Sequence, residues 1–401
     1  MADVSIDSTA AAGTHSGHRN CVFVSQSIGY FFYFDSTSTF VYSKTTNGGS
    51  SWGAPVTIAT AVTHLAFAVW FDKWTPGDSG TLIHTWFFNT TDDDVYWRSL
   101  DTSTDTLGTR QTVFNGASAT VTSATPFVSG TKTTSGYLYC AYDIDAGAEK
   151  GFHRSLDGGA TWSANLATTF IEATLDMAML FPAMGTGDGN DCWCLYNDVS
   201  ANAITLKLWD SSAGSGVESA TIATYIENAT NATTRWGFNG SIRNSDGHLI
   251  MACVNDRDTA TSDHVVYDIT DTSTFSALTS ITTDIDDHYY PNVFINQYNN
   301  DIYIVYNGKR DGSEVLDTTT KVYYTKSTDG GVNWSAGDTV YMEDAAAAVV
   351  QVYVPLTGDR LYAGWRIGTT LLGGYTNSLT FSGGPPPSST YTDTLPFLGA
   401  G

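Results

Sequence analysis

Four arginines in this chain stand where a guanidinium could bind an anion. Three of them lie at or shortly after the end of an apolar run: Arg257, Arg310 and Arg366. The fourth, Arg19, precedes the first such run. A guanidinium presents a planar fork of N–H donors that binds a carboxylate or sulfate with two bonds. Because the chain has only 18 Lys and Arg against 41 Asp and Glu, a cluster of arginines would be a distinctive site for a carboxylate, a sulfate or a sugar acid.

Neighbouring carboxylates offer a second interpretation of two of these arginines. Asp256 and Asp258 flank Arg257, and Asp311 follows Arg310, so local ion pairs could neutralise both guanidinium groups. Such pairs would leave little charge for a ligand. Both interpretations stay open.

Other residue types near the same apolar runs could take part in binding. Trp365 could stack on a sugar ring, or pack in a core. Asp143 begins the pattern Asp143-x-Asp145-x-Gly147-x-Glu149, whose spaced oxygens could bind Ca²⁺ but which lacks the remaining ligands of an EF-hand loop. The predicted ligand site comprises Arg19, Asp143, Asp256, Arg257, Arg310, Trp365 and Arg366, and no metal or cofactor is expected.

Carboxylates alone do not identify a catalytic pair. Hydrolysis of a glycosidic bond needs two carboxyl groups about 5–10 Å apart with different pKa values. The 35 aspartates of this chain supply many such pairs, so none is singled out. The catalytic residues of any hydrolase activity therefore stay unknown.

The elements that would position these residues recur along the chain. Seven apolar, aromatic-rich runs end in a polar residue, and these end residues lie 52 to 59 residues apart: Asp35, Asn89, Asp143, Asn197, Asn255, Asn307 and Arg366. A repeat of this length made of short strands is typical of a β-propeller with one four-stranded blade per repeat. A single blade cannot bury both of its faces, so the blades must close into a ring.

The sequence therefore predicts an all-β fold, a single seven-bladed propeller of antiparallel blades over residues 1–383, with six blades as the alternative. In the first repeat we expect strands near 20–26, 29–35, 40–45 and 54–60. The last repeat lacks a clear fourth strand, and residues 3–9 can supply it, which removes an exposed edge. A short Pro-rich tail follows at 384–401. In such a ring, the loops after the second strands gather at one mouth, where the predicted ligand site would lie.

A recurrent turn separates the third and fourth strands of some repeats. It reads Ser-Leu-Asp-Gly-Gly-Ala-Thr-Trp at 155–162, Ser-Thr-Asp-Gly-Gly-Val-Asn-Trp at 327–334, and more weakly Thr-Thr-Asn-Gly-Gly-Ser-Ser-Trp at 45–52. The Asp or Asn side chain can accept N–H groups of its own turn, the glycines allow positive φ, and the tryptophan seals the hairpin. The predicted structural residues are Asn47, Trp52, Asp157, Trp162, Asp329 and Trp334.

These turns resemble the Asp-box, or bacterial neuraminidase repeat, of the sialidase superfamily of propellers. The resemblance implies that the box is structural and lies on the face opposite an active site. It does not imply activity, because the box occurs in sialidases, other glycoside hydrolases and non-enzymatic proteins. Sialidases typically have six blades, an Arg-Ile-Pro-like motif and a Tyr/Glu nucleophile pair. Here the corresponding place reads Arg19-Asn20-Cys21, and no Glu stands beside a suitable Tyr, so a sialidase site is not carried over.

Charge and the N-terminal sequence limit the partners that we expect. A net charge of −23 argues against binding nucleic acid and anionic membranes. The first residues have neither the basic nor the apolar region of a signal peptide, so we expect synthesis in a cytoplasm. Acidic, Thr/Ser/Gly-rich Asp-box propellers of this kind are similar to virion-associated proteins of bacteriophages.

The resulting hypothesis is a non-enzymatic recognition or structural module of a virion. It would bind a surface glycan or other virion proteins, in many copies that multiply weak single-site binding. The alternative is an exo-acting, sialidase-like glycoside hydrolase.

Overall fold

The computed structural model describes most of the ring. The described residues are 4–10, 15–16, 19–36, 39–60, 66–116, 126–144, 149–167, 170, 175–184, 189–198, 203–224, 237–254, 264–279, 281, 288–308, 321–335, 339–342, 351–367, 370–374 and 378–381. The tail at 384–401 lies outside them, so the boundary after residue 383 stays a prediction.

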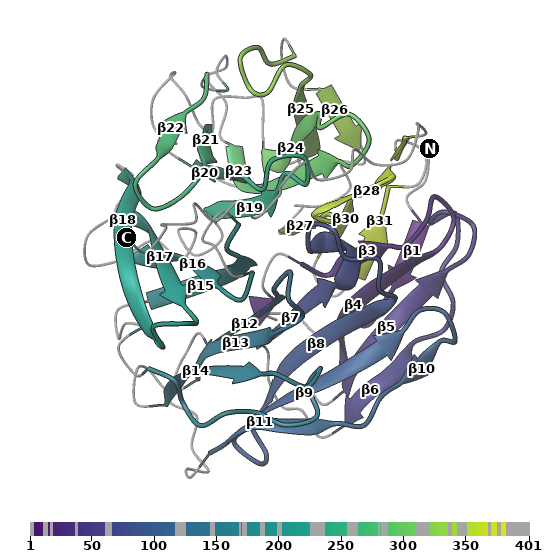
Figure 1. Cartoon of the computed structure of the whole chain (residues 1–401). Helices are drawn as coiled ribbons and strands as arrows, with labels where there is room; N and C mark the ends of the chain where they lie inside the picture. Colours follow the sequence, from purple (N-terminus) through teal and green to yellow (C-terminus); the bar gives the residue numbers. More distant parts are fainter. Residues whose placement is uncertain are drawn as a thin grey trace.

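Seven antiparallel sheets stand side by side around a centre (Figure 1). Blade 1 contains β3 (Cys21–Phe23), β4 (Gly29–Ser36), β5 (Thr39–Thr45) and β6 (Val56–Thr60). Blade 2 contains β7 (Ala66–Phe71), β8 (Leu82–Asn89), β9 (Asp94–Asp101), β10 (Thr106–Leu107) and β11 (Gln111–Asn115). Blade 3 contains β12 (Phe127–Lys132), β13 (Leu138–Asp143) and β14 (Lys150–Ser155). Blade 4 contains β15 (Leu175–Pro182), β16 (Cys192–Asp198), β17 (Ala203–Asp210) and β18 (Ser215–Thr224).

The remaining blades complete the ring. Blade 5 contains β19 (Phe238–Ile242), β20 (Leu249–Val254), β21 (His264–Ile269) and β22 (Phe275–Ala277). Blade 6 contains β23 (His288–Asn296), β24 (Ile302–Gly308), β25 (Lys321–Ser327) and β26 (Thr339–Met342). Blade 7 contains β27 (Gln351–Tyr353), β30 (Gly364–Ile367), β31 (Thr370–Gly373) and β1 (Val4–Asp7). Seven blades are therefore confirmed, and the alternative of six is wrong.

Several short elements accompany the blades. β2 (His15–Ser16) pairs in parallel with β7, and β28 (Thr357–Gly358) pairs in parallel with β23. β29 (Arg360–Leu361) pairs with β32 (Leu379–Thr380). The 3-10 turn η1 (Asp72–Trp74) follows β7. No helix in the described part of the chain is long and apolar enough to cross a membrane.

The ring closes as the sequence predicts. β1 pairs antiparallel with β31 as the outer strand of blade 7, with Val4 opposite Gly373. Ile6 is buried in an apolar cluster that includes Phe31 and Leu371, and the Asp7 carboxylate accepts a hydrogen bond from the Tyr33 hydroxyl at 2.9 Å. The first strand of the chain thus ties blade 7 to blade 1.

The apolar runs of the sequence form the second strands of the blades. All six residues of β13 are buried, as are seven of the eight residues of β8. Stacking of a blade on both neighbours buries both faces of its inner strands, which explains why these runs do not alternate with polar residues. The five cysteines are free thiols, and all of them are buried.

Blade 3 has three strands among the described residues, and an irregular segment takes the place of the fourth. The N–H groups of Ser163 and Leu166 donate to the carbonyls of Arg154 and Phe152, each at 2.8 Å. The Asn165 side chain accepts from the Phe152 N–H at 3.1 Å. Backbone and side-chain hydrogen bonds from this segment therefore satisfy the edge of β14 where a strand would otherwise pair.

The recurrent turns share one hydrogen-bond arrangement. In the copy of blade 3, the Ser155 Oγ donates to Asp157 Oδ1 and accepts from the Gly159 N–H, both at 2.8 Å. Asp157 also accepts from the N–H and the hydroxyl of Thr161 at 2.9 and 2.6 Å. Equivalent contacts close the turns that contain Asp329 and Asn47.

The tryptophan that ends each turn contacts the preceding blade. Trp52 of blade 1 donates to the Tyr362 hydroxyl of blade 7 at 3.1 Å. The ring of Trp162 in blade 3 lies 6.4 Å from that of Trp97 in blade 2. Trp334 of blade 6 donates to the Thr279 carbonyl, which follows the last strand of blade 5, at 2.7 Å. These turns therefore join neighbouring blades.

Candidate functional site

A cavity of about 480 Å³ lies at one end of the ring, among the loops that join first and second strands. These loops share their end of the ring with the recurrent turns, because the Gly48 N–H donates to the Ser27 carbonyl at 2.8 Å. Loops of blades 1, 2, 5, 6 and 7 contribute to its wall. The lining residues used below are Phe23, Phe71, Lys73, Trp74, Asp78, Ser79, Asn244, Gln297, Tyr298 and Asp359.

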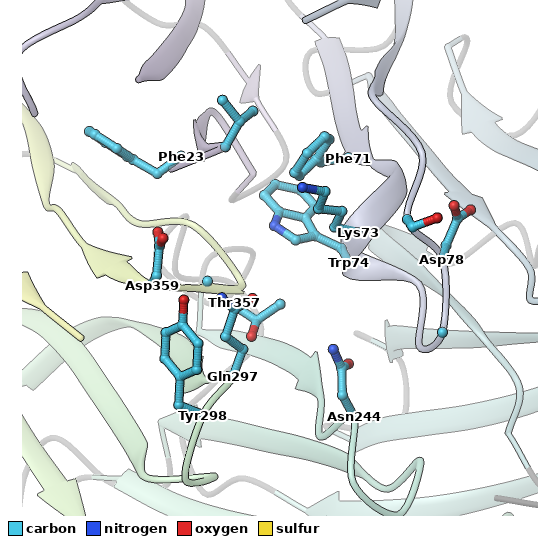
Figure 2. Close-up of a pocket in the computed structure, with 14 residues that line it drawn as sticks. Phe23, Phe71, Lys73, Trp74, Asp78, Asn244, Gln297, Tyr298, Thr357 and Asp359 are labelled. Atoms are coloured by element: carbon cyan, nitrogen blue, oxygen red, sulfur yellow. The ribbon is translucent and has the colours of Figure 1, made fainter. Parts of the chain in front are cut away.

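The wall combines an apolar base with accessible polar groups (Figure 2). Phe23, Phe71 and Trp74 are each at most 3% exposed. Asn244, Gln297 and Tyr298, from blades 5 and 6, are half-buried and stand across the cavity from Trp74 in this view. A volume of this size is typical of a small-molecule site.

The loop at 72–81, between β7 and β8, carries much of this wall. Its start is ordered by η1, where the Thr75 N–H donates to the Asp72 carbonyl at 2.9 Å. The Thr75 hydroxyl accepts a hydrogen bond from Trp70 Nε1 at 2.9 Å. Further along, the Gly80 N–H donates to Asp78 Oδ1 at 2.8 Å. These contacts place Lys73, Trp74 and Asp78 at the cavity.

A buried ionic network supports this loop from the core. Asp72 accepts from His84 Nε2 at 3.0 Å, from Lys132 Nζ at 2.6 Å and from the Leu82 N–H at 2.9 Å. Burial alone would raise the pKa of Asp72, but these hydrogen bonds outweigh burial and lower it to about 2. Burial lowers the pKa of His84 despite the nearby carboxylate, so the neutral ring donates its Nε2–H.

This network predicts sensitivity to acid. Because the pKa of Asp72 is about 2 in the folded protein against 3.8 ordinarily, its contribution to stability is complete above pH 4 and is lost as the pH falls to 2. The loss amounts to about 2 kcal/mol. In denaturant unfolding, the stability difference between wild type and Asp72→Asn should narrow by this amount from pH 5 to pH 2. A constant difference would contradict the prediction.

Two carboxylates stand on opposite sides of the cavity in the close-up view (Figure 2). Asp78 Oδ2 is ion-paired with Lys132 at 2.7 Å. Burial raises the pKa of Asp359, and the positive charges of Lys73 and Arg360 oppose this rise. The exposed ammonium of Lys73 gives the cavity wall charges of both signs.

The residues opposite the 72–81 loop are held by their own loops. Asn244 follows Arg243, whose guanidinium binds Asp246 and Asp268 at 2.6 and 2.9 Å. The Tyr298 N–H donates to the side chain of Asn296 at 2.9 Å. Both loops are therefore anchored by side-chain contacts within their blades.

Arg19 does not lie at the mouth of the ring, where the sequence predicts the ligand site. Its side chain is 3% exposed, and Nη1 donates to the carbonyls of Gly130 and Leu180 at 3.3 and 3.0 Å. Its guanidinium lies over the rings of Trp70 and Phe181, which belong to the first strands of blades 2 and 4. β2, which precedes Arg19 in the chain, pairs with β7, the first strand of blade 2. This pairing places Arg19 beside the first strands of the blades and not among the loops at the mouth.

The other residues of the predicted ligand site are scattered or lie outside the described part of the chain. Trp365 is 1% exposed in the apolar cluster shared by blades 6 and 7, next to the buried Arg366. Asp143 is 5% exposed at the end of β13. Asp256, Arg257 and Arg310 are outside the described residues, so a ligand site at that mouth stays a prediction.

Sequence reasoning missed the cavity because it followed the ends of the second strands, at the opposite mouth. The sequence did contain one indication of the cavity. The connection at 72–81 is longer than its counterpart 24–28 in blade 1, and it contains Lys73 and Trp74. A long loop with an aromatic and a charged residue is a frequent sign of a binding loop. Among the described residues, no group of three or more His, Cys, Asp or Glu side chains could hold a metal ion.

Comparison with known proteins identifies no family. No family model matches the chain, and no curated protein matches it. Three solved structures are similar. The GH74 xyloglucanase from Xanthomonas campestris has a TM-score of 0.50 at 12% identity, over 92% of this chain and 52% of that one. An Aleuria aurantia lectin in complex with Fucα1-6GlcNAc has a TM-score of 0.46 at 9% identity, over 77% of this chain and 90% of that one. The Hadza microbial sialidase has a TM-score of 0.41 at 11% identity, over 84% of this chain and 74% of that one.

The chain spans about half the length of the xyloglucanase chain that it resembles. At such low identities, the xyloglucanase likeness shows the fold alone. The chain is a seven-bladed β-propeller.

Proposed function

We propose that this propeller is a carbohydrate-recognition module and that the cavity beside the 72–81 loop is its ligand site. The observation that carries this proposal is the composition of the cavity wall. A half-buried tyrosine ring, two side-chain amides and a serine hydroxyl surround an apolar base: Tyr298, Asn244, Gln297 and Ser79, over Phe23, Phe71 and Trp74.

This composition suits a sugar ring. The C–H faces of a sugar can stack on the Tyr298 ring, while its hydroxyl groups both donate and accept hydrogen bonds, as amides do. The lining has one ammonium, Lys73, against the two carboxylates Asp78 and Asp359. Because Asp78 is also ion-paired with Lys132, the charges at the wall balance, which favours a neutral sugar over a strongly anionic one.

Glycan-array binding tests the proposal. Tyr298→Ala removes the stacking surface and should weaken binding by about tenfold, equivalent to about 1.4 kcal/mol. Tyr137→Ala is the matched control, because Tyr137 is a half-buried tyrosine in the equivalent loop of blade 3 that does not line the cavity. Equal binding by both variants, or no binding by the wild type, would reject the cavity as a glycan site.

A second candidate function is glycoside hydrolysis at the same cavity. The specific observation is that Asp359, whose pKa is raised by burial, lines the cavity together with the ion-paired Asp78. A protonated carboxyl group can donate its proton to the leaving oxygen while a carboxylate activates water. Release of a fluorophore from any glycoside in a broad panel, abolished by Asp359→Asn, would favour this function over binding alone.

The place of the module in a virion is a further part of the proposal. It is supported by the acidic, Thr/Ser/Gly-rich composition and by the recurrent turns that resemble the Asp-box. In a virion, many copies would raise the avidity of a weak single-site contact. Immunogold labelling of purified particles with an antibody to this chain tests that placement.

A further inference from the structure

Lys132 lies behind the cavity wall and joins two points of the loop that forms much of that wall. Its Nζ is 2.6 Å from Asp72 Oδ1 and 2.7 Å from Asp78 Oδ2. Its side chain is only 17% exposed, so solvent screens these two ion pairs less than it screens surface pairs. Lys132 is the last residue of β12, and blade 3 therefore holds a loop of blade 2.

The backbone of Lys132 reinforces the same connection. Its carbonyl accepts a hydrogen bond from the Thr75 hydroxyl at 2.7 Å. One residue of blade 3 therefore contacts the loop at three positions, Asp72, Thr75 and Asp78. Lys73 and Trp74 lie between the first two of these positions, and both line the cavity.

We propose that Lys132 is a positioning residue for the cavity: by joining Asp72 to Asp78 it fixes the segment that presents Lys73, Trp74 and Ser79 to a ligand. A wall that is already ordered spares a ligand the entropy cost of ordering it. The proposal rests on the proposed function for the nature of the ligand, but the order of the loop is a property of the free protein and can be measured without one.

The contacts also indicate which part of the loop depends on Lys132. Without its ammonium, Asp72 keeps the His84 ring and the Leu82 N–H. Asp78 loses its ion pair with Lys132. Removal of the ammonium should therefore loosen residues 75–80 more than residues 71 and 72.

Hydrogen–deuterium exchange on the full chain tests the proposal. In Lys132→Met, peptides that cover 75–80 should exchange at least tenfold faster, while the centre of β8 remains protected. Lys132→Arg should restore slow exchange, because a guanidinium can also bridge two carboxylates. The matched control is Lys44→Met, which removes the 2.5 Å ion pair of Lys44 with Asp105 between blades 1 and 2 and leaves the cavity lining intact.

Lys132→Met also removes the ion pair of the buried Asp72 carboxylate, which is destabilising by itself. Asp78→Asn therefore serves as a second variant, because it leaves the Lys132–Asp72 ion pair in place. It removes the bridge from the other end and should speed exchange of the same segment. Wild-type exchange at 75–80 in both variants would overturn the proposal. In glycan-array binding, the affinity of Lys132→Met should fall at least tenfold, and that of Lys44→Met should fall less than twofold. If exchange at 75–80 were faster in the variants but the wild type bound no glycan, the result would support the positioning role of Lys132 and reject the proposed function.

Discussion

Replacement of Gly159 or Gly331 by alanine is expected to cost about 2–5 kcal/mol of stability each. Both glycines have positive φ, +96° and +93°, which a residue with a Cβ adopts at a cost of about 1–2 kcal/mol. In addition, a Cβ would overlap the preceding blade, at the ring of Trp97 for Gly159 and at the side chain of Leu278 for Gly331. Overpacking of this kind costs about 1–3 kcal/mol.

The preceding glycine in each turn is a matched control. Gly158 and Gly330 have φ of +70° and +74°, but a Cβ on either would meet nothing within 4 Å. Their alanine variants should therefore lose only the backbone cost of about 1–2 kcal/mol. Denaturant unfolding of all four variants measures both quantities. If Gly158→Ala were as destabilising as Gly159→Ala, the turns would not join blades by close packing.

Substitution of Ile6 by aspartate is expected to open the ring at its closure, at a cost of about 3–4 kcal/mol. Ile6 is 7% exposed on β1 and packs among Phe31, Tyr353 and Leu371. Aspartate would remove this packing and bury an unpaired carboxylate, each of which is destabilising. Because β1 is the outer strand of blade 7, its release would also expose the edge of β31.

Ser5→Asp is the control for Ile6→Asp, since Ser5 lies on the same strand with an exposed side chain. An exposed substitution of this kind should change stability by no more than about 0.5 kcal/mol. Thermal melting compares the two variants directly. A melting temperature for Ile6→Asp equal to that of Ser5→Asp would show that β1 does not hold the ring closed.

Much of the architecture could be predicted because it is encoded locally and repeatedly. The apolar runs became β4, β8, β13, β16, β20 and β24, since a strand buried on both faces needs an unbroken apolar run. The first blade was predicted at 20–26, 29–35, 40–45 and 54–60, close to the observed strands. The missing strand of the last repeat identified β1 as its partner. Each of these inferences depends only on residue pattern and repeat length.

The structural role of the recurrent turns could be predicted for the same reason. Asp157 and Asp329 accept hydrogen bonds from residues four positions further along, so their role follows from local spacing. What local spacing could not show is that Trp162 and Gly159 meet the neighbouring blade. That contact depends on how closely two blades pack.

By itself, the sequence determined an all-β ring of seven blades, closed by its own first strand, with turns that carry their own hydrogen bonds. Only the tertiary structure decided where a ligand could bind. The cavity brings together Trp74, Asn244 and Tyr298, which are far apart in the chain. Arg19 is buried against the first strands of the blades and does not lie at the predicted mouth. The physical reason is that a repeat sets the path of each blade, whereas the shape of the space between loops of different blades depends on how all the blades pack together.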